Sequence, residues 1–369
     1  MNRRLKVLFI SRASLFTVTG GDTIQVTRTA EALQKAGVDI NIKLCNEKDI
    51  HYSSYDLIHF FNIRHPADML FHIQQSKLPY VISTIFVDYT KPAKRKITGI
   101  KDGVLNLFNI NAQEYIKTVS KSLLNGEKII SKKYIWKGHK KSVSWILQNA
   151  ALLLPNSENE YKRLLHSFGV EKKYHVVPNG VDTKRFNYSN KDSGSKDNSM
   201  VLCVARIELI KNQLNLIKAL NGSPFQLYLI GNAAPNHSGY YKQCRKIAGP
   251  NIHFIDEVPQ EQLVEYYRKA KVHVLPSWFE TTGLASLEAL NCGCNIVVTK
   301  YGDTTDYFDP QHCFFCDPAT PASIRNAVEA AATRDINTNY IDSIARQYNW
   351  QNAAEKTIAA YQAVILNNK

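Results

Sequence analysis

Short apolar runs rich in β-branched residues alternate with longer amphipathic stretches along the whole chain. This alternation predicts β-α units and a parallel sheet, because each strand must be joined to the next by a helix that covers the sheet. Two series of such runs are present. The first predicts strands at 6–10, 39–44, 57–60, 80–84, 151–154 and 174–177, and the second at 201–204, 226–230, 252–254, 272–275, 295–299 and 313–315. We therefore expect an α/β protein.

A polar segment lies between the two series of predicted strands. Residues 187–199 contain serine, asparagine, aspartate and lysine and almost no apolar side chain, which is typical of a linker or a long surface loop. A chain of 369 residues also has the length of two ordinary domains. We predict a first domain at 1–186, a linker at 187–200 and a second domain at 201–350.

Two helices are predicted most clearly. The stretch 23–36 places Val26, Ala30 and Leu33 on one side and ends at Gly37, since glycine readily adopts the left-handed conformation that stops a helix. A second helix is predicted at 284–290, directly before Asn291-Cys292-Gly293.

The formal net charge of +14 is concentrated in one segment. Residues 91–150 contain thirteen basic and three acidic residues, and the remainder contributes only +4. Within this segment, residues 91–141 break the β-α rhythm, mix lysines with aromatic residues and are expected to form helices that extend the first domain. Such a surface suits the anionic headgroups of a membrane, but solvated helices are an alternative. Nucleic acid is not expected as a partner, because no recognised nucleic-acid-binding module is present.

Several features bear on cellular location. The apolar run at residues 7–10 is too short for the core of a signal peptide, and no apolar stretch of 18 residues is present. Seven cysteines, odd in number and sparse, are typical of buried thiols in a reducing compartment. Zinc binding by Cys292/Cys294 and Cys313/Cys316 is not expected, because both pairs adjoin apolar strands. We expect a cytoplasmic protein, soluble or peripheral at the cytoplasmic face of a membrane.

The loop after the first predicted strand carries a pair of glycines. The chain has neither a G-x-x-x-x-G-K-[ST] motif nor a G-x-G-x-x-G motif after this strand. Instead, Gly20-Gly21-Asp22 opens the first helix, where backbone amides and a helix N-terminus favour an anion. An ordinary strand-to-helix turn is the alternative interpretation.

Two cations follow the first strand of the second series. Arg206 and Lys211 lie in the loop that leaves the carboxyl end of the predicted strand 201–204, where open α/β sheets bind ligands. Two positive charges there suit a diphosphate. Solvated surface charges are the alternative interpretation, and the one favoured when these two residues are taken alone.

Two carboxylates follow the strand 272–275. Glu280 lies in the loop and Glu288 in the predicted helix that begins at Gly283. If the stretch between them were all helical, they would be about 12 Å apart, which is too far for a retaining glycosidase pair. The spacing matches the two ends of a nucleotide-sugar, with the amides of Thr282 and Gly283 facing the diphosphate. A glutamate on a solvated helix face is the alternative for Glu288.

Taken together, these motifs resemble those of retaining glycosyltransferases of glycosyltransferase family 4. The resemblance covers nearly the whole chain, and its most specific part is the pair Glu280 and Glu288 with the preceding Pro276-Ser277. The other matching residues are Gly20-Gly21, Leu154-Pro155-Asn156-Ser157, Val177-Pro178-Asn179-Gly180-Val181-Asp182 with Phe186, Arg206 with Lys211, and Tyr348-Asn349-Trp350. The resemblance implies the GT-B fold, in which two Rossmann-like domains with parallel sheets face an inter-domain cleft.

The resemblance also implies an activity and roles for residues. A hexosyl residue would pass from a nucleotide diphosphate sugar to a glycan or lipid-linked acceptor with retention of configuration, in bacterial cell-surface polysaccharide or glycolipid synthesis. Arg206 and Lys211 would stabilise the leaving diphosphate, Glu280 would hold the sugar and Glu288 the ribose, and no metal or other cofactor would be required. The donor-binding residues would further include Gly20, Gly21, Thr281, Thr282 and Gly283. The helix at 351–369 would cross back to the first domain.

The sequence departs from the family pattern at three places. Many relatives carry a histidine after the fourth strand, about where Phe86 lies here, and Asp88 follows it. The segments Gly293-Cys294-Asn295 and Tyr301–Thr305 also differ from the usual pattern. These differences leave the donor open. A sugar-nucleotide epimerase of GT-B fold and a non-catalytic scaffold that binds polyanions or membranes are the alternative functions.

Overall fold

The computed structural model describes residues 4–18, 20–47, 49–87, 115, 118, 131–189 and 196–366. The chain divides into two compact units. Unit 1 comprises Met1–Pro178 together with Trp350–Lys369, and unit 2 comprises Asn179–Asn349. The boundary therefore differs from the predicted one, because it lies eight residues before the predicted end of the first domain at residue 186.

Unit 1 contains a five-stranded parallel sheet in the order β2-β1-β3-β4-β5. Its strands are β1 Lys6–Ser11, β2 Asp39–Leu44, β3 Leu57–Phe61, β4 Tyr80–Ser83 and β5 Leu152–Leu154, and its helices include α1 Gly21–Lys35, α2 Pro66–Ser76, α6 Lys132–Asn149, α7 Glu158–Phe168 and α15 Trp350–Leu366. Alternate residues of β1 enter the two cores on opposite faces of this sheet, because successive side chains of a strand point to opposite sides.

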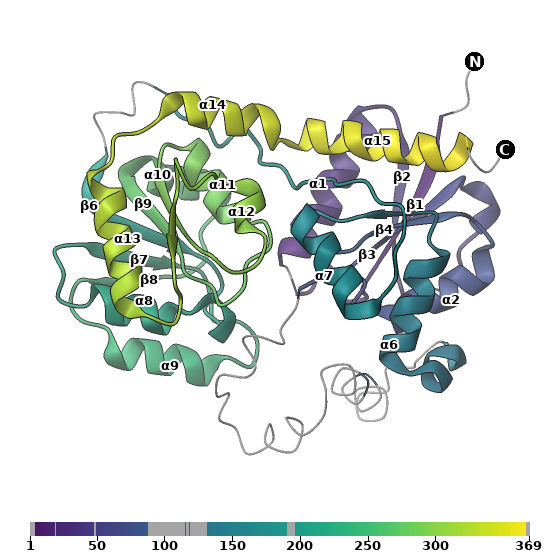
Figure 1. Cartoon of the computed structure of the whole chain (residues 1–369), viewed down its shortest axis with the longest axis horizontal. Helices are drawn as coiled ribbons and strands as arrows, with labels where there is room; N and C mark the ends of the chain where they lie inside the picture. Colours follow the sequence, from purple (N-terminus) through teal and green to yellow (C-terminus); the bar gives the residue numbers. More distant parts are fainter. Residues whose placement is uncertain are drawn as a thin grey trace. The chain divides into compact units, whose positions relative to one another are not determined.

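The last helix belongs to unit 1. Helix α15 packs beside α1 (Figure 1), and its apolar face joins the core that contains Val7 and Phe9 of β1. A buried hydrogen-bonded chain fixes it further, since His59 Nδ1 lies 2.6 Å from Tyr361 Oη and His59 Nε2 lies 2.8 Å from Ser83 Oγ. Burial lowers the pKa of His59 to about 3, so this histidine is neutral in the folded protein at neutral pH.

Unit 2 contains a six-stranded parallel sheet in the order β11-β10-β9-β6-β7-β8. Its strands are β6 Asp197–Val204, β7 Gln226–Ile230, β8 Ile252–Ile255, β9 Ala270–Leu275, β10 Asn295–Thr299 and β11 Phe314–Cys316. Its helices are α8 Gln213–Leu220, α9 Ser238–Ile247, α10 Gln260–Lys269, α11 Leu284–Asn291, α12 Thr304–Tyr307, α13 Pro321–Thr333 and α14 Thr338–Gln347. Counted from the first strand of the unit, this is the doubly wound order 3-2-1-4-5-6 of nucleotide-binding sheets, whose direction reverses between β6 and β9.

Two predicted segments differ from the structure. The prediction of a strand at 174–177 is wrong: only Tyr174 forms an isolated bridge, with Leu153, and the following residues run on as an extended segment. The predicted linker 187–200 contains the start of β6 at Asp197. Lys196 directly before it donates from Nζ to the carbonyl oxygens of Tyr267, Ala270 and Cys292, at 2.8–3.0 Å.

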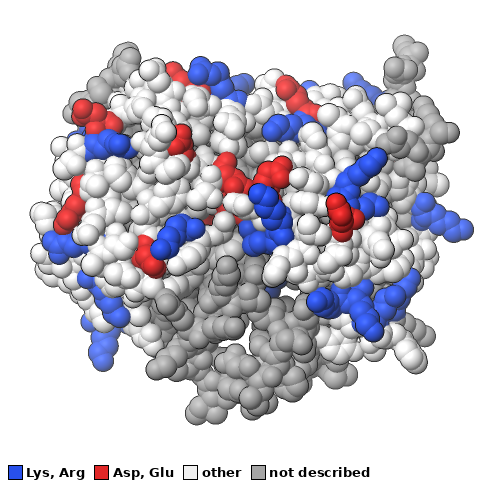
Figure 2. Space-filling view, viewed as in Figure 1, with Lys and Arg blue, Asp and Glu red and all other residues white. Residues whose placement is uncertain are grey.

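The basic segment 91–141 lies for the most part outside the described residues. Its described end is α6, where Figure 2 shows lysine side chains gathered on the surface. Gly138 interrupts this helix with φ of 70°, and Trp136 beside it is 92% exposed. Among the helices described for this chain, none has the length and hydropathy needed to cross a bilayer.

All seven cysteines are free and buried, as the sequence predicted. Burial raises the pKa of these thiols, to about 12 for Cys203, so they are unreactive packing residues. The described residues include no group of three or more His, Cys, Asp or Glu side chains placed to hold a metal ion.

Candidate active site

Two loops of unit 2 that carry predicted site residues leave the sheet where its strand order reverses, and they bring Lys211 and Glu280 together. The loop from Ala205 to Asn212 leaves β6, and the loop from Pro276 to Gly283 leaves the neighbouring strand β9. The two loops are in direct contact, because the amide of Trp278 donates to the carbonyl of Ile210 at 2.8 Å. Ligands of doubly wound sheets bind at this point, outside the carboxyl ends of the strands.

Lys211 and Glu280 form an ion pair across these two loops. Lys211 Nζ lies 2.6 Å from Glu280 Oε2, and their side chains are only 22% and 9% exposed. Ser277 Oγ donates to the same carboxylate oxygen at 3.1 Å, and the Thr281 amide donates to Oε1 at 3.2 Å. The carboxylate is thus held by three donors in a water-poor site, where each charge–dipole interaction is stronger than in water.

The backbone at Glu280 is fixed by the segment 301–303. The Glu280 amide donates to the carbonyl of Tyr301 at 3.1 Å, and the amide of Asp303 donates to the Glu280 carbonyl at 2.8 Å. Gly302 lies between them with φ of +107°, and a Cβ there would overlap the carbonyl oxygen of Glu280. Only glycine permits this approach.

A second glycine, Gly231, shapes the loop that carries the cations. Its φ is +138°, and a Cβ would overlap the carbonyl oxygen of Ala205. This approach lets the loop after β6 run alongside the end of β7, with the amide of Ile207 donating to the Asn232 carbonyl at 2.9 Å. Arg206 lies in this loop, where its side chain is 44% exposed and Nη2 lies 3.3 Å from Glu208 Oε1.

Thr282 and Gly283 lie directly before α11. Gly283 is the N-cap, in the left-handed conformation with φ of 68°. Asn179 Nδ2 donates to Thr282 Oγ1 at 3.0 Å, and Thr282 Oγ1 lies 3.3 Å from Tyr307 Oη. Asn179 of the Pro178-Asn179-Gly180 motif thus acts in unit 2 by fixing the turn that precedes α11, a role that the motif alone did not indicate.

Glu288 lies in the second turn of α11 and is half-buried. The hydroxyl of the fully buried Tyr267 donates to its Oε2 at 3.3 Å. Burial and then the charge of Glu288 raise the pKa of Tyr267 well above its usual value, so Tyr267 remains a donor. Because α11 begins only at Leu284, the separation of about 12 Å for an all-helical stretch from Glu280 does not apply here.

The glycine pair of the first loop lies in unit 1. Gly20 is the N-cap of α1 with an extended φ of −162°, and a Cβ on Gly21 would meet no atom within 4 Å. A side chain at position 21 would therefore find open space, and the extended backbone at position 20 is one that any residue can adopt. The structure describes each unit by itself, so these two residues remain a prediction for the donor site.

Arg12, which the sequence did not single out, organises the loop before this pair. Its guanidinium donates to both carboxylate oxygens of Asp22, at 2.7 and 3.0 Å, and to the carbonyls of Ser14 and Val18, each at 2.7 Å. Burial alone would raise the pKa of Asp22, but the hydrogen bond and charge of Arg12 outweigh it and lower that pKa.

Phe86 lies about where many relatives carry a histidine, but its side chain is not at the surface. Its ring is buried, packs against Phe168 with centroids 5.5 Å apart and belongs to the core of unit 1. Asp88 lies outside the described residues.

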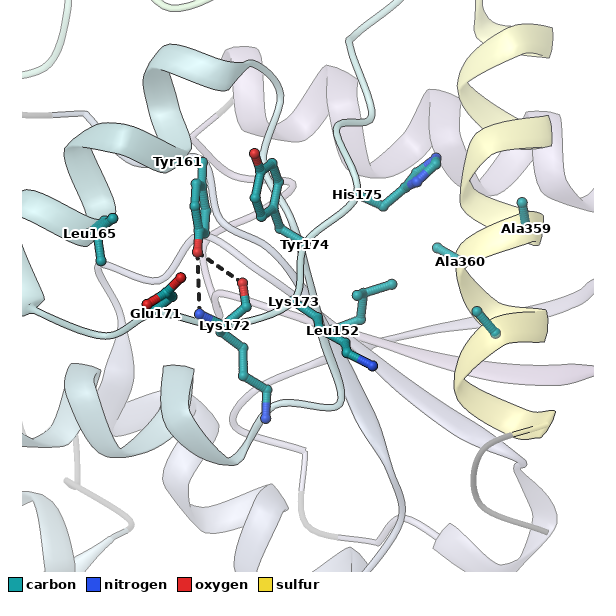
Figure 3. A pocket seen from close by; sticks show the side chains of 11 residues that line it. Leu152, Tyr161, Leu165, Glu171, Lys172, Lys173, Tyr174, His175, Ala359 and Ala360 are labelled. Atoms are coloured by element: carbon teal, nitrogen blue, oxygen red, sulfur yellow. Dashed lines mark hydrogen bonds between the residues drawn. The ribbon is translucent and has the colours of Figure 1, made fainter.

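Unit 1 has a groove of about 900 Å³ that is separate from the charged cluster of unit 2. Figure 3 shows Tyr161 and Tyr174 on one side of it and Ala359 and Ala360 of α15 on the other. The tyrosine rings stack with centroids 3.6 Å apart. None of the predicted site residues lines this groove, so the candidate site remains the charged cluster of unit 2.

Residues 185–348 match the model of the family Glycosyl transferases group 1. Over these residues the chain is similar to the group 1 glycosyl transferases. The match contains every predicted site residue of unit 2, including Arg206, Lys211, Glu280 and Glu288.

Curated relatives carry related names. The D-inositol 3-phosphate glycosyltransferase of Acidothermus cellulolyticus is 24% identical over 249 residues, which are 61% of this chain and 56% of that protein. The chain thus spans a little more than half the length of this relative.

Solved structures match nearly the whole chain. A sucrose-phosphate synthase from Thermosynechococcus elongatus has a TM-score of 0.75 at 18% identity, covering 99% of this chain and 100% of that one. The Anabaena protein HepE in complex with UDP-glucose has a TM-score of 0.71 at 15% identity, covering 98% and 100%. These similarities show the fold alone, and they confirm the predicted GT-B class.

Proposed function

We propose that this protein is a glycosyltransferase that moves a hexosyl residue from a nucleotide diphosphate sugar to a glycan or lipid-linked acceptor, with retention of configuration. The observation that carries this proposal is the Lys211–Glu280 pair at the point where the strand order of unit 2 reverses. It joins a cation suited to a diphosphate to a carboxylate suited to sugar hydroxyls. The group 1 family match of the same residues supports it.

The chemical task is to break an anomeric C–O bond while negative charge develops on the departing diphosphate. Lys211 and Arg206 place positive charge beside that group, and each well-placed donor can lower the barrier by about 3 kcal/mol. Glu280 is held rigidly by Ser277 and Thr281 and would accept hydroxyl hydrogens of the sugar. Glu288 would accept those of the ribose.

Fixed cations in this role remove the need for a metal, since they neutralise the same charge that a divalent ion neutralises elsewhere. Retention would follow if the acceptor attacks the face from which the diphosphate leaves. We propose such a same-face reaction without a nucleophile from the enzyme.

The direct test is a panel of UDP-, GDP- and ADP-sugars scored by thermal stabilisation. A true donor at about 100 times its Kd should add about 2.7 kcal/mol to the free energy of unfolding. UDP-glucose is the first choice, because HepE binds it. Anomeric proton couplings in the NMR spectrum of the product then decide retention. An isomerised donor formed without acceptor would instead indicate an epimerase, and binding that follows salt alone would indicate a scaffold.

We further propose that the enzyme works in cell-surface polysaccharide or glycolipid synthesis at the cytoplasmic face of a membrane. The support is the excess of lysine at 91–141 and the exposed Trp136 on α6, a combination suited to an anionic interface. Cosedimentation with phosphatidylglycerol vesicles should exceed that with phosphatidylcholine and should weaken in Trp136→Ser. The matched control is Leu366→Ser, which removes another exposed apolar side chain.

A further inference from the structure

The turn that leaves β4 contains a strained residue. Ile85 has a φ of +44°. The left-handed region is unfavourable for a β-branched side chain, because its Cβ substituents crowd the backbone. Such a conformation persists only where the surrounding structure determines it, and residues of this kind concentrate at functional sites.

Glu160 contributes much of the surrounding structure that keeps Ile85 in this conformation. This glutamate of α7 is fully buried, and its carboxylate oxygen Oε1 accepts hydrogen bonds from both neighbours of Ile85. These donors are the Thr84 hydroxyl and the Phe86 amide, the latter at 2.8 Å. The other oxygen, Oε2, accepts from the Asn156 amide at 2.8 Å. One buried carboxylate therefore ties together the loops that leave β4 and β5.

The carbonyl groups on either side of Ile85 are held as well. The amide of Ile63 donates to the Thr84 carbonyl at 3.0 Å, and Arg163 Nη2 donates to the Phe86 carbonyl at 3.1 Å. The network continues to α1, because Gln25 and Asn156 exchange side-chain hydrogen bonds of 2.8 and 3.1 Å. A buried network of hydrogen bonds of this kind restricts the conformation of the turn.

The turn lies where a fixed backbone can affect ligand binding. It lies at the carboxyl end of a parallel strand, the edge at which such sheets bind ligands. The Phe86 side chain points into one core and Ile85 packs against the other, so the turn presents its backbone at that edge rather than an imidazole.

We propose that Glu160 is a positioning residue for glycosyl transfer, which holds the Thr84–Ile85–Phe86 turn in the one conformation that fits the reacting substrates. This inference rests on the proposed function. It assigns Glu160 no contact with substrate.

The test measures UDP release from UDP-glucose by the full-length protein. Glu160→Gln puts an amide NH2 group where one carboxylate oxygen accepted hydrogen bonds, so we expect kcat to fall about 10- to 100-fold through misplacement of the turn. The Kd for UDP, measured by calorimetry, should stay within about twofold, since the diphosphate cations lie in unit 2. Thr84→Val removes one donor to Glu160 and should lower kcat in the same sense, which keeps the test valid if Glu160→Gln does not fold.

A rescue variant separates positioning from general stability. Glycine adopts positive φ without cost to Cβ, so adding Ile85→Gly to Glu160→Gln should restore kcat by roughly threefold or more. Asp56→Asn is the matched control, because Asp56 also accepts a backbone amide, that of Lys6, but at the amino end of the same sheet. It should leave kcat unchanged.

Two outcomes would overturn the inference. Unchanged kcat in folded Glu160→Gln or Thr84→Val, with only a lower melting temperature, would make Glu160 a purely structural residue while the proposed function stands. A wild-type protein that neither binds nor turns over any donor of the panel would overturn the proposed function and this inference with it.

Discussion

Lys211 Nζ and Glu280 Oε2 lie 2.6 Å apart, although the two residues are 69 positions apart in the sequence. Each charge offsets the cost of burying the other, so the pair behaves as one unit before any ligand arrives. A diphosphate that binds Lys211 must share that cation with the carboxylate, which leaves Glu280 oxygens available to hydroxyl groups.

Lys211→Met should therefore affect both binding and stability. We expect the Kd for UDP to rise about 100-fold and the free energy of unfolding to fall by about 3 kcal/mol, because the buried Glu280 loses its counter-charge. Calorimetry and urea denaturation measure the two effects. The double variant Lys211→Met/Glu280→Gln should recover most of the stability but none of the binding, and recovery of binding would contradict the assignment.

Gly302→Ala should disrupt the site by a steric route. Its Cβ would overlap the Glu280 carbonyl, and φ of +107° is unfavourable for alanine, so we expect a loss of about 3 kcal/mol or more. Chemical denaturation tests this loss. Gly239→Ala in α9 is the control, since a Cβ there meets nothing within 4 Å and alanine favours helix by up to about 1 kcal/mol. Equal effects of the two substitutions would show that the approach to Glu280 is unimportant.

Gly21→Ala should leave the fold intact and weaken ligand binding. A Cβ at this position meets no protein atom, so the free energy of unfolding should change by less than about 1 kcal/mol. If the glycine pair approaches a donor, the methyl group should lower kcat/KM about tenfold or more. Wild-type kinetics in this variant would instead support an ordinary strand-to-helix turn.

Stability should fall between pH 6.5 and pH 5. Burial lowers the pKa of His59 and of His273 from 6.5 to about 3, so the unfolded chain takes up protons in this range and the folded protein does not. Each histidine then costs about 2 kcal/mol by pH 5, and the loss is absent above pH 6.5. Urea midpoints measured at pH 7 and pH 5 should show it. His59→Gln should flatten the profile, and an unchanged profile would mean that His59 is protonated in the folded state.

The strands with strong local signals were predicted well from sequence. Residues 39–44, 226–230 and 295–299 have the same bounds in the structure. The first alternates polar and apolar side chains and the other two are mostly apolar, and both patterns are typical of strands. The segment 174–177 has a similar composition, but it is joined to β5 only by single hydrogen bonds. The local sequence does not distinguish such a segment from a full strand. The start of β6 was missed since Asp197–Ser199 is polar.

The charged residues of the site were predictable, but their supports were not. Arg206, Lys211 and Glu280 stand out as charges after apolar strands. Ser277 and Asn179 contribute through hydrogen bonds that form only in the folded chain. Gly231 is required because its backbone approaches the carbonyl of Ala205, which lies 26 residues earlier in the sequence. Glu160 resembles an ordinary residue of a helix N-terminal turn until the strained Ile85 is seen beside it.

The place of α15 in unit 1 has a consequence for how the protein is made. The ribosome completes the sheet of unit 1 and then all of unit 2 before it adds Trp350–Leu366. Until Ala353, Tyr361 and Val364 emerge, the apolar surface around Val7 and Phe9 lacks its cover. Unit 1 is thus begun before unit 2 and finished after it, and its uncovered apolar surface is a site for aggregation while unit 2 is being synthesised.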